Sequence, residues 1–131
     1  MKKFLFLRFW KPVFSAAQRR LDARVRQSVD AWVMNKGYTK PLVSVEDIAG
    51  DIGVPADQLA RYIHIAKRKP VLSWRKELRL EEARYLLVAL PELPVSTIGE
   101  MVGIEDKSNF RKQFTQFTGV SPLEWRKRYG L

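Results

Sequence analysis

The stretch IGEMVGI (Ile98–Ile104) repeats the pattern of IAGDIGV (Ile48–Val54), which lies 50 positions earlier in the chain. Both stretches place apolar residues at helical spacing and end in a glycine followed by an aliphatic side chain. Each is then followed by two apolar anchors four residues apart. The anchors are Leu59 and Ile63 in the first copy and Phe110 and Phe114 in the second. A short helix, a glycine turn and a second helix packed by its i and i+4 positions form a helix-turn-helix, so the chain is predicted to hold two.

The segment between the two motifs predicts a long helix. Val71–Leu90 contains neither glycine nor proline, and Pro91 and Pro94 follow it. A helix of this length spans roughly 30 Å. It is therefore long enough to hold two recognition helices about 34 Å apart, the distance between successive major grooves on one face of DNA. With no strand-like alternation elsewhere, the predicted fold is all-α, with about seven helices in two helix-turn-helix subdomains joined by a linker helix.

A further helix is predicted ahead of the first motif, from about Ser15. Its apolar residues recur at three- and four-residue spacing, and Gly37 is the expected C-cap. The inward-facing residues are Leu21, Val25, Val29, Trp32 and Val33.

The first residues, MKKFLFLRFWKPVF (Met1–Phe14), form a basic N-terminal extension. Arg8 and Lys11 interrupt its apolar run and no small-residue cleavage site follows, so a signal peptide is not expected. An aromatic anchor, a disordered tail and the stub of a longer chain remain open. The expected organisation is an extension over residues 1–16 and a DNA-binding domain over 17–128. That domain divides into a first subdomain (17–69), the linker helix (71–90) and a second subdomain (95–128).

Composition excludes several classes of function. The 131 residues include no cysteine and one histidine, His64, so disulfide frameworks and thiolate metal sites are absent and Ser-His-Asp chemistry is not expected. There is no glycine-rich phosphate loop and no paired nucleophile and base. No stretch reaches the roughly 18 apolar residues of a membrane span. We therefore expect no enzymatic activity, no cofactor, no metal and no evident small-molecule site.

The net charge of +10 indicates a polyanionic partner, with nucleic acid favoured over an anionic membrane. The charge is unevenly distributed. Residues 1–42 carry 10 basic and 2 acidic side chains, whereas residues 43–66 carry 1 basic and 4 acidic ones. Residues 67–94 carry 7 and 4, and residues 95–131 carry 6 and 4. The excess lies mainly in the N-terminal part, where it supplies attraction to phosphates without reading sequence.

The stretch LSWRKELRLEEARYLL (Leu72–Leu87), followed by IGEMVGIEDKSNFRKQFTQFTGVSPLEWRKR (Ile98–Arg128), closely resembles the DNA-binding domain of AraC/XylS-type transcription regulators. The most specific part runs through TGVSP (Thr118–Pro122) to the pair Trp125-Arg126, and the similarity covers roughly Leu21–Arg128. The resemblance implies seven helices, binding to double-stranded DNA, and activation or repression of transcription, often with contact to RNA polymerase.

The resemblance also implies which side chains face DNA. In the second recognition helix the base-facing residues are Lys107, Ser108, Asn109, Arg111 and Lys112. In the first they are Asp57, Ala60 and Arg61, with Gln58 and His64 nearby. Arg61 is the strongest candidate there, because a guanidinium binds guanine O6 and N7 together. Its alternative is an ion pair with Asp57 one turn earlier.

A second group of residues is expected at phosphates. Ser44 and Ser96 begin the first helix of each motif, where free N–H groups favour anions, with ordinary capping as the alternative. Lys67, Arg68 and Lys69 form a basic connector that is equally explained as a solvated charge run.

The chain departs from the family pattern in three places, namely the second motif, the turn after the first recognition helix and the outer face of that helix. Gly99 replaces alanine and Ile104 replaces phenylalanine in the second motif. The turn after the first recognition helix reads Lys67-Arg68-Lys69-Pro70, where glycine is usual. Asp57 and Ala60 are poor base readers, so the second motif is expected to dominate sequence recognition.

The leading hypothesis is a sequence-specific DNA-binding transcription regulator, located in the cytoplasm with the nucleoid. The alternative is a protein-interaction or membrane-proximal module with weak DNA binding, suggested by the basic N-terminal part. Family members commonly carry a separate sensing or dimerisation domain. The chain is therefore either a small stand-alone regulator or the output part of a longer one, in which case tethering to a membrane through an upstream segment stays open.

Overall fold

The computed structural model describes the backbone of residues 2–131 and the side chains of residues 16–131. Within that range the chain forms seven α-helices and one 3-10 turn, with no strand. The elements are α1 (Lys2–Met34), η1 (Gly37–Thr39), α2 (Val45–Ile52), α3 (Ala56–Lys67), α4 (Val71–Ala89), α5 (Val95–Met101), α6 (Lys107–Thr118) and α7 (Pro122–Tyr129). The prediction of an all-α double helix-turn-helix is confirmed, and the linker helix ends within one residue of its expected bound.

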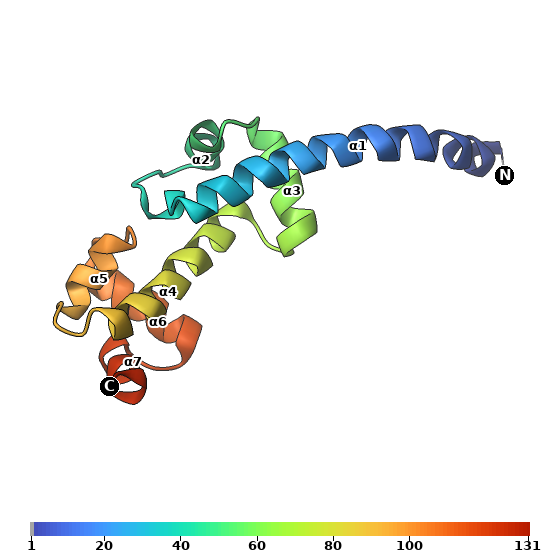
Figure 1. Ribbon diagram of the computed structural model, residues 1–131. Helices are drawn as coiled ribbons and strands as arrows, with labels where there is room; N and C mark the ends of the chain where they lie inside the picture. The colour runs from blue at the N-terminus through green and yellow to red at the C-terminus, as the bar shows by residue number, and fades with distance from the viewer. Residues whose placement is uncertain (1) are drawn as a thin grey trace.

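The apolar side chains gather in two separate cores, one toward each end of α4. Figure 1 shows the two groups of helices, α1 to α3 and α5 to α7, at opposite ends of α4. The first core joins α1, α2 and α3 to the start of α4, and Trp32 and Trp74 stack in it with ring centroids 5.7 Å apart. The second joins α5, α6 and α7 to the rest of α4 and centres on Phe110 and Phe114, 5.9 Å apart. Because α4 contributes to both cores, it carries the two subdomains as one folded unit.

Helix α1 differs from its prediction at both ends. Its backbone is helical from Lys2, well ahead of the expected start near Ser15, and extends past the rest of the protein in Figure 1. The side chains of residues 1–15 lie outside the described part, so the proposed anchor or tail is not addressed. The expected C-cap at Gly37 is wrong. The helix ends at Met34, and Lys36 adopts the left-handed conformation at φ 57°.

Gly37 serves a packing role instead of a capping one. A Cβ atom at this position would lie 2.2 Å from Nε1 of Trp32, so only glycine lets η1 pass over the indole. Val25, Val29 and Trp32 are buried as predicted, whereas Leu21 is 40% exposed. Leu21 precedes the stretch of α1 that packs against the first core.

The helix boundaries of the motifs follow local capping rules. The Ser44 hydroxyl accepts from the Asp47 N–H at 3.0 Å and the Asp47 carboxylate accepts from the Ser44 N–H at 3.1 Å, so Ser44 caps α2 through a capping box, in line with the capping role given above as the alternative to a phosphate contact. Helix α5 begins one residue before the expected Ser96, because Pro94 precedes Val95 with an extended backbone. Helix α7 begins after its N-cap Ser121 and continues to Tyr129.

The departure from alanine at Gly99 has a packing cause. A Cβ atom there would lie 2.8 Å from the ring of Phe110, the first apolar anchor of α6. The matching positions in the first motif are Ala49 and Leu59, where the anchor is smaller. The larger ring in the second motif therefore requires the smaller residue beneath it.

Candidate nucleic-acid interface

The second recognition helix, α6, presents one apolar and one basic face. Phe110 and Phe114 point into the second core, and Asp106 caps the helix by accepting from the Asn109 N–H at 2.7 Å. The opposite face holds the five predicted base-facing residues, all of them exposed. They are Lys107, Ser108, Asn109, Arg111 and Lys112. Within the described residues none of the three cations among them forms an ion pair, so each is available to an anionic partner.

A hollow of about 350 Å³ adjoins this basic face and joins three helices. Its lining includes Lys107 and Arg111 from α6, Ser96 from α5 and Ser121 from the start of α7. Ser96, predicted at a phosphate from its place in the sequence, therefore lies beside two of the predicted base-facing cations. Ser121 also caps α7, since its hydroxyl accepts from the Glu124 N–H at 3.1 Å.

The first recognition helix, α3, buries Leu59 and Ile63 and turns the predicted set outward. Asp57, Ala60 and His64 are exposed and Gln58 is half-buried. Arg61, the strongest candidate of this helix, forms an ion pair with Asp22 of α1 at 2.9 Å. The alternative partner Asp57 is not the one the structure selects, because α1 crosses α3 and brings Asp22 alongside.

The role of Asp22 was invisible to sequence reasoning, since it lies 39 residues from Arg61. The residues near Asp22 in the sequence indicate only a contact within α1, in which the Gln18 side chain donates to the same carboxylate oxygen at 3.0 Å. Arg61 and Asp22 have exposed side-chain fractions of 44% and 38%, so water screens their attraction and the pair opens readily. Arg61 thus stays available to DNA at a small cost in free energy.

The three residues of the basic connector after α3 differ in their contacts. Lys67 is exposed, and Arg68 takes the left-handed conformation at φ 61° that ends α3. Lys69 pairs with Glu77 of α4. The missing glycine of the family pattern is thus replaced by an arginine held in the backbone conformation that glycine favours.

The other predicted phosphate residue, Ser44, lies in a less favourable electrostatic setting. Its hydroxyl and N–H are both engaged in the capping box, and Glu46 and Asp47 occupy the first turn of α2. Hydrogen bonds from the Ser44 N–H and hydroxyl and from the Val43 N–H lower the pKa of Asp47, which keeps that carboxylate charged. Two negative charges at this helix end oppose a phosphate.

Two arrangements typical of other classes of protein are not found among the described residues. Across the described part of the chain, no group of His, Asp and Glu side chains is placed to hold a metal ion. Among the described helices none combines the length and apolar content of a membrane crossing. Two helix-turn-helix motifs on one linker helix, with a basic face exposed on the second recognition helix, define the class of DNA-binding proteins.

Comparison with known proteins agrees with this class. Residues 48–128 match a helix-turn-helix domain family. The arabinose operon regulatory protein of Escherichia coli (strain K12) is 26% identical over 122 residues, which is 93% of this chain and 41% of that protein. The C-terminal domain of AraT, a response regulator from Geobacillus stearothermophilus, has a TM-score of 0.69 at 26% identity, over 85% of this chain and 87% of that chain.

A structure of the AdpA DNA-binding domain in complex with a target DNA shares the fold, with a TM-score of 0.67 at 19% identity over 80% of this chain and 91% of that one. The chain belongs to the AraC-type helix-turn-helix family of DNA-binding transcription regulators, which is not a family of enzymes. It spans less than half the length of the arabinose regulatory protein that it matches.

Proposed function

We propose that this chain is the DNA-recognition unit of a transcription regulator in which α6 reads most of the sequence and α3 supports it. The observation that carries the proposal is the contrast in free charge between the two helices. Lys107, Arg111 and Lys112 are exposed and unpaired within the described residues, whereas Arg61 is held by Asp22. A cation that is free before binding has no ion pair to break, so the free energy of its contacts with DNA adds fully to affinity, and its contacts with base edges also distinguish sequences.

The remaining candidates divide by the kind of contact they make. Ser108 and Asn109 add short hydrogen-bonding groups to α6. In α3, the Asp57 carboxylate can accept from cytosine N4, Ala60 offers an apolar contact, and Gln58 and His64 lie nearby. The phosphate contacts come from Lys67, Arg68, Lys69 and Ser96, with Ser44 the weakest. These groups supply affinity that depends on salt and not on sequence.

The partners beyond DNA follow from the family and from the part of the relatives that this chain matches. We propose that a sensing or dimerisation part and a contact to RNA polymerase complete its action, which takes place in the cytoplasm at the nucleoid. The E. coli relative is named for the arabinose operon, and control of an operon by this chain is a proposal of the same kind.

Selection of bound sites from random duplex DNA, using the full chain, tests the proposal. We expect a site with two parts whose centres lie about 10 base pairs apart, because two recognition helices on one linker helix enter successive major grooves. The part that contacts α6 is expected to be the more strictly specified. A footprint confined to one groove, or equal binding to all duplexes, contradicts the proposal.

A further inference from the structure

The turn η1 and the residue that follows it are held to α4 by a half-buried arginine. Arg79 donates from Nε to the Tyr38 carbonyl at 2.6 Å and from Nη2 to the Lys40 carbonyl at 2.8 Å. One turn earlier on α4, Arg75 donates to the Leu42 carbonyl. We call Arg79 with the two carbonyls it binds the Arg79 clamp. It fixes the segment that joins α1 to α2 onto the linker helix.

The Arg79 clamp depends on a charged side chain that is partly buried. Within the described part of the chain no carboxylate pairs with Arg79, and burial, with a smaller contribution from the Arg75 charge, lowers the pKa of its guanidinium to about 10. The group therefore remains charged at neutral pH. A charged donor forms stronger hydrogen bonds to carbonyl oxygens than a neutral one, which makes the clamp a firm contact.

The second motif touches the same clamp through its turn. Gly103, between α5 and α6, has φ 94°. A Cβ atom there would lie 2.7 Å from the Thr39 carbonyl oxygen and 3.0 Å from Cζ of Arg79. The turn that leads into the second recognition helix is thus packed directly on the loop of the first subdomain and on the clamp that holds it.

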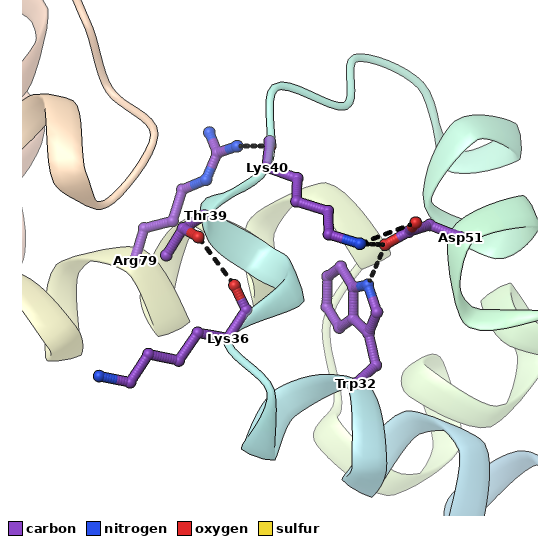
Figure 2. A network of polar contacts seen from close by, with 6 residues as sticks. All are labelled: Trp32, Lys36, Thr39, Lys40, Asp51 and Arg79. Carbon is purple, nitrogen blue, oxygen red and sulfur yellow. Dashed lines mark hydrogen bonds and ion pairs between the residues drawn. The ribbon is translucent and has the colours of Figure 1, made fainter.

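The clamp also continues toward the first motif (Figure 2). The Lys40 ammonium donates to the Asp51 carboxylate at 3.0 and 3.1 Å, and the Trp32 indole N–H donates to Asp51 at 2.8 Å. Asp51 lies in the last turn of α2, two residues before Gly53 and the turn into α3. Lys40 therefore links Arg79, through its carbonyl, to the turn of the first motif, through its ammonium group.

We propose that Arg79 is a positioning residue that fixes the separation and rotation of α3 and α6 relative to each other. The inference rests on the proposed function, in which both helices enter DNA. The two cores are separate among the described residues, and the contacts of Gly103 with Thr39 and Arg79, together with the Lys40 carbonyl that Arg79 binds, connect the two turns outside the backbone of α4. Each base pair advances the groove by about 3.4 Å and 34°. If α3 and α6 move relative to each other, they therefore no longer select two sets of base pairs at one fixed spacing.

The first experiment measures the distance between α3 and α6 in the absence of DNA. The chain has no cysteine, so Ala66→Cys and Gln116→Cys, at exposed sites on α3 and α6, accept spin labels without competition. Double electron–electron resonance is expected to give one narrow distance distribution for the labelled parent. Arg79→Gln removes the charge and the forked pair of donors, and the distribution is expected to broaden and shift.

Two further variants keep this experiment decisive. Arg79→Gln leaves the Tyr38 carbonyl without its donor and can unfold the chain, so Lys40→Ala breaks the link to Asp51 from an exposed position that does not support either core. It is expected to broaden the distribution to a smaller extent. Lys76→Gln removes a positive charge from an exposed site on α4 and is expected to match the parent. Folded Arg79 and Lys40 variants that keep the parent's narrow distribution overturn the inference.

The second experiment measures the consequence on DNA, using the site selected with the parent chain and versions with one base pair added or removed between its two parts. We expect the parent to lose about tenfold in affinity on each altered spacing, since one recognition helix then misses its bases. In Arg79→Lys, which keeps the charge but not the fork, the loss is expected to fall to about threefold or less. A variant that is merely less stable would bind all spacings more weakly and keep the tenfold preference, which contradicts the positioning role.

The two proposals fail in different ways. If the parent selects no two-part site, the proposed function is wrong, whatever the spin-label distances are. If the parent selects such a site and the Arg79 variants keep its spacing preference, only the positioning role is wrong.

Discussion

The two recognition helices have the same length and different charge. Helices α3 and α6 each contain 12 residues, and each packs two apolar anchors four residues apart into its core. Helix α3 carries Asp57 on its outer face and ties Arg61 to α1. Helix α6 carries three basic side chains and no acidic one. A shared scaffold therefore specifies where a helix lies, and the outer residues decide how much each helix contributes to recognition.

The residues that end the two recognition helices also differ. Both close in the left-handed conformation, at φ 86° for Gly119 after α6 and at φ 61° for Arg68 after α3. Glycine adopts this conformation without a steric penalty, whereas arginine does not. The first motif thus keeps a basic side chain at a position where the second uses the residue that favours stability.

The largest expected effect is on DNA affinity and lies in α6. Arg111→Ala and Lys112→Ala are each expected to weaken binding to the selected site by more than about tenfold, because each removes an unpaired cation that is proposed to contact bases. Arg61→Ala is expected to cost less, and Asp57→Ala is expected to change affinity little or raise it. Fluorescence anisotropy with a labelled duplex measures all four.

Gln116→Ala is the control for these changes, since Gln116 is exposed and uncharged and lies in the C-terminal half of α6, away from the N-terminal residues that reach base edges in this motif. Loss of binding in Asp57→Ala, together with parent-like binding in Arg111→Ala, would reverse the ranking of the two motifs.

The next effect is on stability and concerns the end of α3. Arg68→Gly is expected to raise the free energy of unfolding by about 0.5–1 kcal/mol, the steric relief at positive φ less the entropy that glycine loses on folding. Urea denaturation followed by circular dichroism measures it. Arg68→Ala removes the same charge but keeps the strain, so a similar gain in that variant would show that charge, and not backbone conformation, is responsible.

A smaller effect is expected at the ion pair that holds Arg61. Asp22→Asn keeps the size of the side chain and releases the guanidinium, so affinity for the selected site is expected to rise about threefold, in keeping with the modest strength of an exposed pair. Asp30→Asn removes the same charge from an exposed site two turns further along α1. If both variants raise affinity equally, general electrostatic attraction explains the gain and the ion pair plays no part.

The smallest effect concerns pH and the carboxylate at the end of α2. Hydrogen bonds from the Trp32 indole, and then from Lys40, hold the pKa of Asp51 below its ordinary value of 3.8. A lowered native pKa contributes stability that is present above pH 3.8 and is lost as the pH falls through the native value. The urea midpoint is therefore expected to fall between about pH 5 and pH 2, and to fall less in Asp51→Asn. Asp30→Asn is expected to keep the parent's profile, and an unchanged profile in Asp51→Asn contradicts this role of Asp51.

The helices and their order were predictable because each depends on local pattern. The capping box at Ser44, the left-handed turn at Gly53 and the anchors Phe110 and Phe114 are visible within a few residues of sequence. The predictions failed at Gly37 and Lys36, where the close approach of η1 to Trp32 decided which residue takes the unusual conformation. Such an approach depends on how helices pack, which local pattern does not report.

Part of the candidate site was likewise predictable from local pattern, and part depends on how the helices pack. The exposed positions of α3 and α6 follow from their apolar anchors, so the sequence alone places Lys107, Arg111 and Arg61 on outer faces. Which of these cations is free follows from partners far away in the chain, as with Asp22, 39 residues from Arg61. The residues facing DNA stay a prediction until binding is measured.

By itself, the sequence determined two helix-turn-helix motifs, a linker helix of the right length and a more basic second recognition helix, since periodicity, glycine turns and charge are properties of short segments. Only the tertiary structure decided that Asp22 holds Arg61 and that Arg79 joins the loop after η1 to α4 beside Gly103. Hydrogen bonds and close contacts between segments about 40 residues apart require the folded arrangement of the helices, because only packing brings their atoms within 3 Å.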